Sequence, residues 1–295
     1  MAIKKLDSRI ACCKIPPVRF SIITPSFNSS PWLKLCLASV ADQGVALEHI
    51  VQDAGSTDGT LDWLRQDNRV KLFVERDGGM YDAINRGLRR ANGEILAYLN
   101  CDEQYLPGCL QTVEKFFLNN PLIDVVFGHS VVVDSELRYL FHRKVQVPLK
   151  YHTWVSHLST LTCATFFRRK ILDERGLFFD ARLRGVGDGE WMLRLLQNRV
   201  PMSALRQFTS VFTVTGVNMS ARPNAIRERR ELQASAPFWA RKLKSFLVLH
   251  HRLRRLAGGI YFQGPFSFSI YTHKSGGQRI PIHVTHPRFQ WRMHE

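Results

Sequence analysis

The chain has 295 residues, of which 45% are hydrophobic and 22% are charged. This composition supports a sizeable core and excludes intrinsically disordered, collagen-like and disulfide-scaffold proteins. Lysine and arginine outnumber the acidic residues by 41 to 25, and the formal net charge of +16 predicts an anionic partner. Nucleic acid, acidic lipid and phosphorylated small molecules all fit that charge.

Signals for export and for disulfide bonding are missing from the sequence. The N-terminal segment is charged without an apolar core, and no run approaches the ~18 apolar residues of a membrane span. The six cysteines show no C-x-x-C spacing and are too sparse for a secreted scaffold. We therefore expect a cytoplasmic protein with reduced thiols.

From residue 18 to about residue 119, short β-rich runs alternate with helical patterns. Strands are predicted over residues 18–24, 49–52, 70–74 and 95–99, and helices over residues 31–40, 57–66, 80–90 and 106–118. This alternation is typical of an α/β fold in which helices cover a mostly parallel sheet.

The middle of the chain is less regular. Further strands are predicted over residues 125–133, 162–167 and 205–214, with a helical turn over 168–174. A helix over 190–197 follows a glycine-punctuated segment at 185–189, and a polar loop is expected at 217–220.

Four of the predicted strands end in polar, turn-rich loops, at residues 24–28, 53–60, 75–82 and 100–103. Ordinary turn chemistry explains any one such loop, because Asp, Asn, Gly and Ser dominate turns. Ligands of open parallel sheets bind beyond the carboxyl ends of the strands. Four polar loops at that edge therefore predict a ligand site there.

Several of these segments are long enough to carry a family resemblance. They read FSIITPSFN (20–28), DAGSTDGT (53–60), ERDGGMYDAINRG (75–87), ANGEILAYLNCDE (91–103) and GDGEWMLRL (187–195). In this order and spacing they resemble family 2 glycosyltransferases, over roughly residues 18–220. The resemblance implies a GT-A fold, in which a Rossmann-like nucleotide-binding half joins an acceptor-binding half. It also implies inverting transfer of a sugar from a nucleotide-sugar, with a UDP-sugar favoured, to a hydroxyl of a glycan or lipid-linked glycan.

The resemblance assigns donor-binding roles to residues at the strand ends. The implied nucleotide-sugar contacts are Pro25, Ser26, Asn28, Asp53, Gly55, Asp77, Asn85 and Asn100. Asp53 would bond the base, and a carboxylate that only accepts hydrogen bonds suits a ring N–H such as that of uracil. The alternative for Asp53 is an ordinary turn or capping role.

The segment 100–103 corresponds to the metal motif of the family. A divalent cation, Mn²⁺ or Mg²⁺, would neutralise the charge that grows on the leaving pyrophosphate. Asp102 is the expected ligand, with Glu103 beside it. Asn100 and Glu103 depart from the usual acidic pattern, whereas Cys101 is expected to be a packing residue because hard cations prefer oxygen.

Asp188 matches the catalytic base of the family, and Glu190 follows it as a second candidate catalytic residue. An inverting transfer needs a carboxylate that takes the proton of the incoming hydroxyl. Flanking Gly187 and Gly189 are expected to permit unusual backbone and close approach of substrate. The alternatives are a helix-capping role for Asp188 and a favourable charge in the first helical turn for Glu190.

Half of the net charge lies in residues 222–255, which hold ten basic and two acidic side chains. A helix over 239–257 would align Trp239, Leu243, Phe246, Leu247, His250, Leu253 and Ala257 on one stripe, opposite Arg241, Lys244, Arg252 and Arg255. Such a helix predicts attachment to an anionic membrane surface. Packing of the stripe on the domain is the alternative.

The expected organisation is a glycosyltransferase domain over residues 15–220 and a basic extension over 221–295. The nucleotide-sugar half would span about 15–120 and the acceptor half about 121–220. We expect a peripheral protein on the inner face of the cytoplasmic membrane, acting in surface-polysaccharide, lipopolysaccharide or exopolysaccharide assembly. Two other hypotheses are a non-catalytic scaffold and a basic nucleic-acid-binding protein, although no nucleic-acid module is recognisable.

Overall fold

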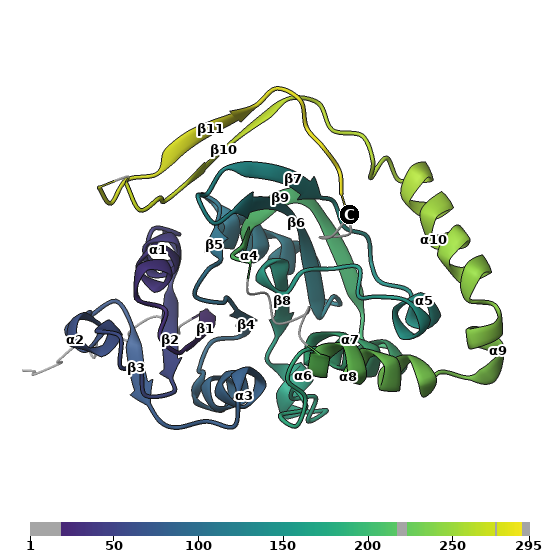
Figure 1. Cartoon of the computed structure of the whole chain (residues 1–295), viewed down its shortest axis with the longest axis horizontal. Helices are drawn as coiled ribbons and strands as arrows, with labels where there is room; N and C mark the ends of the chain where they lie inside the picture. The colour runs from purple at the N-terminus through teal and green to yellow at the C-terminus, as the bar shows by residue number, and fades with distance from the viewer. Residues whose placement is uncertain (1–18, 217–222, 275, 291–295) are drawn as a thin grey trace, which may run out of the picture.

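One large sheet organises the protein, whose computed structural model describes residues 19–216, 223–274 and 276–290. Within these residues the sheet has nine strands in the order β3-β2-β1-β4-β8-β6-β9-β5, with β7 paired to β6 (Figure 1). The predicted α/β class is confirmed.

The first half of the chain forms the parallel part of the sheet. Its elements are β1 (Phe20–Ser26), α1 (Ser30–Ala41), β2 (Leu47–Asp53), α2 (Thr60–Leu64), β3 (Lys71–Val74), α3 (Met80–Arg90) and β4 (Ile95–Tyr98). β1 pairs in parallel with β2 and β4, and β2 pairs in parallel with β3. The carboxyl ends of β1 and β2 therefore lie side by side, with Ser26 opposite Asp53.

The second half adds strands of mixed direction. Its elements are β5 (Gln104–Tyr105), α4 (Cys109–Asn119), β6 (Val125–Asp134), β7 (Tyr139–Arg143), α5 (Lys150–Val155), the 3-10 turn η1 (Thr162–Ala164), β8 (Thr165–Arg168), α6 (Lys170–Asp173), α7 (Gly187–Gln197) and β9 (Met202–Val214). β8 runs antiparallel between β4 and β6 and so joins the two halves of the sheet.

Helices cover both faces of the sheet. Ile22 belongs to an apolar cluster with residues of α1 and α4, whereas neighbouring Ile23 packs with residues of α3 and α7. Because successive strand residues point to opposite faces, the continuous apolar run of β1 is explained by burial on both sides.

Most predicted elements are confirmed, with shifted ends. The helix over 80–90 has the predicted bounds. The helix over 57–66 is shorter and begins at Thr60, because the amide of Thr57 donates to Asn28 and Asp58 accepts from the hydroxyl of Thr60. The helix over 106–118 begins three residues late because Gly108 has a left-handed backbone, with φ of 73°. β5, β7 and α5 were not predicted, and the expected loop at 217–220 lies outside the described residues.

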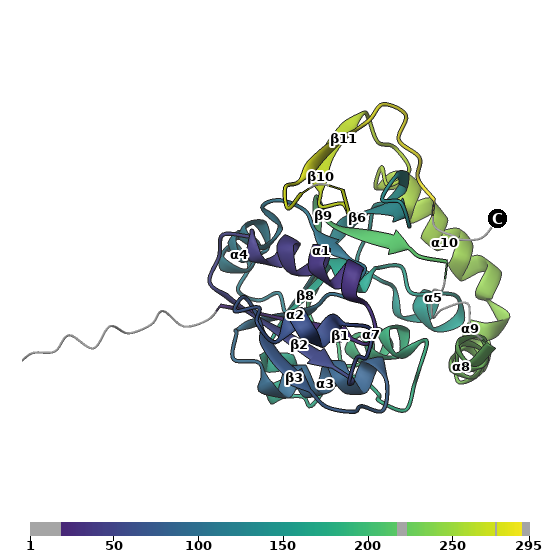
Figure 2. The same cartoon turned by 60° about the vertical axis from the view of Figure 1, so that its left-hand side comes forward.

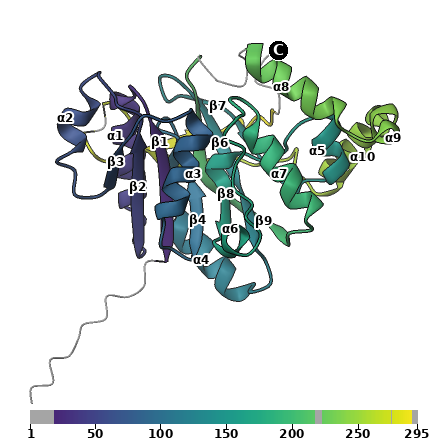
Figure 3. The same ribbon diagram turned by 90° about the horizontal axis from the view of Figure 1, so that it is seen from below.

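The C-terminal region contains three helices and a hairpin. These are α8 (Pro223–Ala234), α9 (Phe238–Lys242), α10 (Lys244–Ala257), β10 (Phe266–Ile270) and β11 (Ile280–Val284). The single helix predicted over 239–257 is wrong, since the chain bends at Leu243 between α9 and α10. Figures 2 and 3 show α10 beside α5, at the side of the molecule away from β3.

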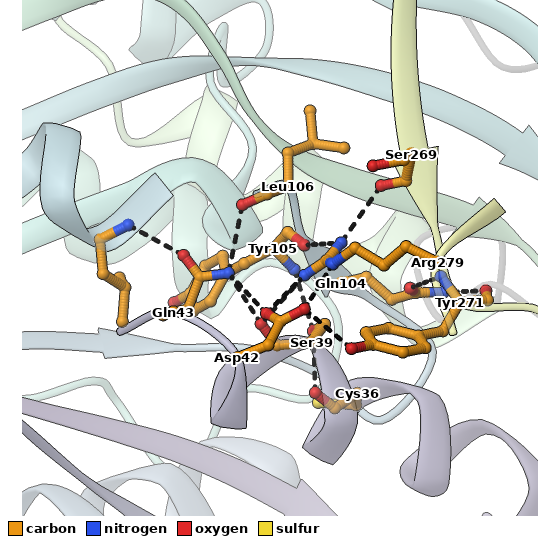
Figure 4. A network of polar contacts seen from close by, with 11 residues as sticks. Cys36, Ser39, Asp42, Gln43, Gln104, Tyr105, Leu106, Ser269, Tyr271 and Arg279 are labelled. Atoms are coloured by element: carbon orange, nitrogen blue, oxygen red, sulfur yellow. Dashed lines mark hydrogen bonds and ion pairs between the residues drawn. The ribbon is translucent and has the colours of Figure 1, made fainter. Parts of the chain in front are cut away.

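The β10–β11 hairpin is fastened to the sheet by a polar network centred on Arg279 (Figure 4). The guanidinium donates to Asp42 at 2.5 and 2.8 Å and to the carbonyl of Tyr105 at 3.0 Å. Tyr271 donates its hydroxyl to Asp42 at 2.8 Å, and its backbone exchanges two hydrogen bonds with the side chain of Gln104. The C-terminal hairpin is thus bound to the end of α1 in the first half and to β5 in the second half.

We expect Arg279→Ala to loosen this hairpin without unfolding the sheet. The change leaves the Asp42 carboxylate and several carbonyls without their donor, which costs about 2 kcal/mol of docking free energy. Hydrogen exchange of amides 266–284 measures this loss directly. Arg138→Ala, which removes an exposed ion pair beside β7, is the control. Equal protection in the two variants would contradict the assignment.

Candidate active site

The loops that follow β1 and β2 are joined by hydrogen bonds. The amide of Asn28 donates to Oγ of Ser56 at 2.8 Å, and Asn28 Oδ1 accepts from the amide of Thr57 at 2.9 Å. Ser30 likewise donates its amide to Asp58 at 3.2 Å. Asn28 has a φ of 50°, a left-handed conformation that asparagine tolerates. The predicted loops at residues 24–28 and 53–60 are therefore joined, and Pro25 and Ser26 belong to the first of them. We call these two loops, together with the 75–82 loop that follows β3, the rim.

Asp53 holds this rim together from inside. It is fully buried, and its carboxylate accepts from the amides of Gly55 and Ser56 and from the hydroxyls of Ser26 and Ser56, at 2.7–2.9 Å. These four bonds use the acceptor capacity of a carboxylate. These contacts agree with the alternative turn role of Asp53, whereas a direct bond to the base stays a prediction.

Gly55 and Gly79 shape the rim through their backbone. Gly55 has a φ of 93° and open space where a side chain would be, which leaves its backbone accessible. Asp77 accepts from the amide of Gly79 at 2.8 Å. A Cβ at Gly79 would clash with the exposed guanidinium of Arg184, so this cation lies directly against the 77–79 loop. Sequence reasoning missed Arg184, which has no motif of its own.

Asn85 does not face the rim. Its side chain is buried, donates to the carbonyl of Phe179 at 2.8 Å and accepts from the amide of Phe179 at 3.0 Å. These contacts give the predicted contact with the nucleotide or sugar no support, and it stays a prediction. Asn85 instead fastens α3 to the segment that leads to α7.

The segment 100–103 places three oxygen-bearing side chains at the end of β4. Burial raises the pKa of Asp102 to about 6, and burial together with the charge of Asp102 raises the pKa of Glu103 to about 8. One Glu103 oxygen accepts from the amide of Asn100 at 2.8 Å. Cys101 is buried and donates to the carbonyl of Pro25, which agrees with a packing role.

These oxygens fit a hard divalent cation. Glu103 Oε1 and Asn100 Oδ1 are buried and accept no hydrogen bond from any residue that the structure describes. Buried acceptors in this state are costly, and a cation would satisfy them while relieving the repulsion between the two carboxylates. Asp102, half-buried beside them, carries further carboxylate oxygens.

We expect the stability of the metal-free protein to fall as pH rises from about 5 to 8. The folded state keeps the Glu103 proton up to about pH 8, whereas the unfolded chain releases it near pH 4.5. The free energy of unfolding should drop by up to about 1.4 kcal/mol per pH unit in that window. Urea unfolding with EDTA, compared between wild type and Glu103→Gln, measures the slope.

The Gln variant should flatten most of this dependence. Glu136→Gln is the matched control, because Glu136 is an exposed glutamate in the β6–β7 turn. An unchanged slope in Glu103→Gln would show that Glu103 titrates normally in the folded state.

Asp188 lies in the first turn of α7, in contact with Tyr81 of α3. The Tyr81 hydroxyl accepts from the amide of Asp188 at 3.1 Å and lies 3.4 Å from its carboxylate. Burial raises the pKa of Asp188. The carboxylate borders a cavity of about 10 Å³, room for one water, which Tyr98 and Thr162 also line.

The glycines on either side of Asp188 have different surroundings. A Cβ at Gly187 would clash with the ring of Tyr81, whereas Gly189 has open space above it. Both glycines have helical backbone, so the expectation of an unusual backbone is wrong. The expectation that substrate approaches closely at these glycines stays a prediction. Val186, not Asp188, occupies the N-cap position.

Glu228 is a second residue that sequence reasoning missed. Although it belongs to the basic stretch, it is buried on α8 and accepts from the amides of Arg184, Gly185 and Val186 at 2.9–3.2 Å. Three charge-assisted bonds hold the loop that precedes Asp188. In the sequence, Glu228 is marked only by being an acidic residue between arginines.

Glu190 and Trp191 of α7 both form contacts within the protein. Glu190 forms a bidentate ion pair with Arg194, at 2.6 and 2.9 Å, so its carboxylate is engaged within the helix rather than offered to substrate. The catalytic assignment of Glu190 is therefore not retained. Trp191 is a core residue that stacks on Phe179 and donates to the carbonyl of Leu177.

The basic helix has an apolar face in solvent. Phe246, Leu249, Leu253 and Leu256 recur at helical spacing and are 52–64% exposed. Arg241, Lys244 and Arg252 are exposed as expected. Arg255 is buried against Phe289, and burial lowers its pKa to about 10, so its predicted place on a membrane surface is wrong.

The predicted stripe is shifted because α10 packs on α5. Leu247 is half-buried against α5 and α9 residues, whereas Leu249 and Leu256 join the exposed face. None of the helices in the described segments has the length and hydropathy that a bilayer crossing requires.

Two curated relatives show similarity to part of this chain. A PGL/p-HBAD biosynthesis glycosyltransferase of Mycobacterium bovis is 34% identical over 195 residues, which cover 61% of this chain and 70% of that protein. The putative teichuronic acid biosynthesis glycosyltransferase TuaG of Bacillus subtilis is 32% identical over 121 residues, or 39% of this chain and 48% of that protein.

Solved structures share the fold at low identity. S. aureus TarS 1-349 in complex with UDP-GlcNAc superposes with a TM-score of 0.58 at 19% identity, over 81% of this chain and 73% of that chain. A longer TarS chain is covered over only 44% of its length. The mannosyltransferase PcManGT of Pyrobaculum calidifontis, in complex with GDP-Man and Mn²⁺, has a TM-score of 0.53 at 19% identity, over 82% and 79% of the two chains.

The family model described as glycosyl transferase family 2 matches residues 21–176. That match ends before α7, yet it includes the rim, Asp102 and Glu103. The chain belongs to glycosyl transferase family 2 and is a glycosyltransferase.

Proposed function

We propose that the protein transfers a sugar, with inversion, from a nucleotide-sugar to an acceptor hydroxyl, with Asp188 as the general base. The observation that carries this proposal is the placement of Asp188. Its carboxylate comes from the second half of the chain, yet its charge lies close enough to Glu103 to raise the pKa of that residue. The nearness of Asp188 to Glu103 supports a base and a cation-binding segment that act on one substrate from opposite halves of the chain.

The roles in this mechanism follow from the geometry. Asp188 accepts the proton of the acceptor hydroxyl as that oxygen attacks the anomeric carbon, and its raised pKa strengthens it as a base. Tyr81 and Glu228 are positioning residues that hold the Asp188 amide and the preceding loop. Asp102, Glu103 and Asn100 would hold Mn²⁺ or Mg²⁺, which when bound neutralises negative charge on the leaving diphosphate.

The donor contacts are proposed for the rim. Pro25, Ser26, Asn28 and Gly55 line the first two loops, and Asp77 lies at the third beside Arg184, whose guanidinium suits a diphosphate. UDP-sugars are the favoured donors, in keeping with the UDP-GlcNAc bound to TarS. A glycan or lipid-linked glycan is the proposed acceptor, in keeping with relatives named for teichuronic acid and PGL/p-HBAD biosynthesis.

A thermal-shift panel of UDP-, GDP- and dTDP-sugars, each with and without Mn²⁺, tests the donor assignment. A ligand that binds only the folded state raises the melting temperature by mass action. We expect a Mn²⁺-dependent shift with UDP-sugars, and Asp102→Asn should remove the Mn²⁺ dependence. If no nucleotide-sugar shifts the transition and no transfer occurs, the scaffold hypothesis gains and the proposed reaction is wrong.

We further propose that the α9–α10 helices attach the enzyme to an anionic membrane surface on its cytoplasmic side. The exposed apolar face of α10 is flanked by exposed cations, Arg241, Lys242, Lys244 and Arg252. In a bilayer, the apolar side chains would enter the boundary between headgroups and acyl chains, and the cations would contact acidic headgroups. One membrane surface therefore satisfies both the apolar face and the basic residues. The alternating apolar and basic pattern favours this interpretation over nucleic acid, which offers no site for the apolar face.

A further inference from the structure

Three histidines from distant parts of the chain meet between α5 and α10. His152 lies on α5, His157 follows two residues after that helix ends, and His251 lies in the middle of α10. The ring centroids of His152 and His251 are 3.8 Å apart, and those of His152 and His157 are 4.7 Å apart. One ring nitrogen from each of the three lies within 4.8 Å of the others.

Two of these rings are buried without hydrogen bonds. His152 is 1% exposed and His251 is 2% exposed. Both nitrogens of each ring lack a hydrogen-bond partner among the residues that the structure describes. Buried polar atoms are almost always satisfied in folded proteins, so four orphaned nitrogens in one small cluster point to a missing ligand.

The protonation state suits a metal ligand. Burial, reinforced by the charge of Arg255, lowers the pKa of His152 to about 4 and that of His251 to about 2. Both imidazoles are therefore neutral near pH 7 and present lone pairs. Neutral imidazole is the form that binds Zn²⁺ and related ions.

We propose that His152, His157 and His251 bind a transition-metal ion, Zn²⁺ above all, through three imidazole nitrogens. The absence of carboxylates from the cluster disfavours Mg²⁺ and Ca²⁺, which take oxygen ligands. A tetrahedral site with Zn–N distances of about 2.0 Å brings its nitrogens to about 3.3 Å. The three rings would therefore have to turn from their present positions, in which the nitrogens lie within 4.8 Å of one another.

The neighbouring arginines bear on which group would be the fourth ligand of the metal. Arg254 and Arg255 both lower the pKa of His251, so the site already has positive surroundings. A divalent ion bound there is best completed by an anion or a hydroxide, whose charge these guanidiniums offset. This site differs in chemistry and in its elements from the oxygen-lined segment 100–103.

The metal would act as a cross-link between α5 and α10. The segment that leads into α5 already forms two hydrogen bonds with α10, from Gln146 to the Arg254 carbonyl and from Arg254 to the Val147 carbonyl. A bound ion would add a stronger tie and would fix which face of α10 points away from the domain. The inference does not rest on the proposed transfer reaction.

Metal analysis of the untagged full-length chain tests the site. After EDTA treatment and exchange, the protein is titrated with Zn²⁺ and, separately, with Co²⁺, whose visible absorption reports tetrahedral nitrogen ligands. We expect one equivalent of Zn²⁺ per chain by elemental analysis. At a hundredfold excess over Kd the melting temperature should rise by about 5 °C.

Variants assign the ion to the cluster. His251→Ala and His157→Ala should each lose the bound equivalent and the Co²⁺ spectrum. His250→Ala is the matched control, because the neighbouring His250 is exposed on the same helix. Failure of a cluster variant to fold leaves the wild-type stoichiometry decisive. Less than a tenth of an equivalent of Zn²⁺ in wild type, or full binding in both cluster variants, would overturn the proposal.

Discussion

Asp188→Asn should lower kcat by about 10²–10⁴-fold, the range that general-base assistance supplies. Asparagine preserves the size of the side chain but cannot take a proton. The backbone contact with Tyr81 uses the amide of residue 188, so the loop should keep its shape. Donor binding should therefore be unchanged, and a steady-state assay paired with donor titration separates the two effects.

The control for this variant is Asp180→Asn. Asp180 lies in the segment between α6 and α7 and forms a surface pair with Arg182, so its substitution removes equal charge at a position outside α7. We expect turnover close to wild type. Comparable losses in the two variants would attribute the effect of Asp188→Asn to charge rather than to proton transfer.

The pH profile gives a second signature of Asp188. Because burial raises its pKa, the acid limb of kcat/KM should lie above the range of an ordinary aspartate. Activity falls as pH drops through that pKa, since the base becomes protonated. The residual activity of Asp188→Asn should lack this limb.

Replacing Arg241, Lys244 and Arg252 by Glu should release the protein from anionic vesicles, with a loss of about 10²-fold in partitioning. Each basic side chain near an anionic leaflet contributes about 1 kcal/mol. Sedimentation with vesicles of phosphatidylserine and phosphatidylcholine measures the change. High salt should weaken wild-type binding, because exposed charges are screened.

Two matched variants separate charge from location. Replacing Arg65, Lys115 and Arg199 by Glu alters net charge equally at exposed positions outside α9 and α10 and should leave binding nearly intact. Phe246→Ser with Leu253→Ser should weaken partitioning without altering charge. Unchanged co-sedimentation of the tail charge variant would refute attachment through these helices.

The sequence predicts those features that depend on local patterns. The helix over 80–90 has its predicted ends because its apolar spacing is strong, and the rim loops follow from residues that favour turns. Asp53 and Asn85 form contacts within the protein that the sequence does not predict. Their partners, Ser26 and the Phe179 backbone, are brought to them only by folding.

The same limit applies to the C-terminal helix. Periodicity identifies an amphipathic helix but does not decide which face meets the protein. Packing of His251 and Arg255 on the domain turns Leu249 and Leu256 outward, a choice made by α5. Glu228 is invisible to motif reasoning because the amides it accepts from lie more than forty residues earlier in the chain.

The three hydrogen bonds that Glu228 accepts determine where the chain can be truncated. A fragment ending at residue 220 would keep every residue proposed to meet donor, cation or acceptor. It would nevertheless lose the acceptor for the amides of Arg184, Gly185 and Val186, just ahead of Asp188. We therefore expect a fragment ending at residue 220 to be inactive, and deletion mapping from the C-terminus should abolish turnover before it reaches any residue proposed to take part in the reaction.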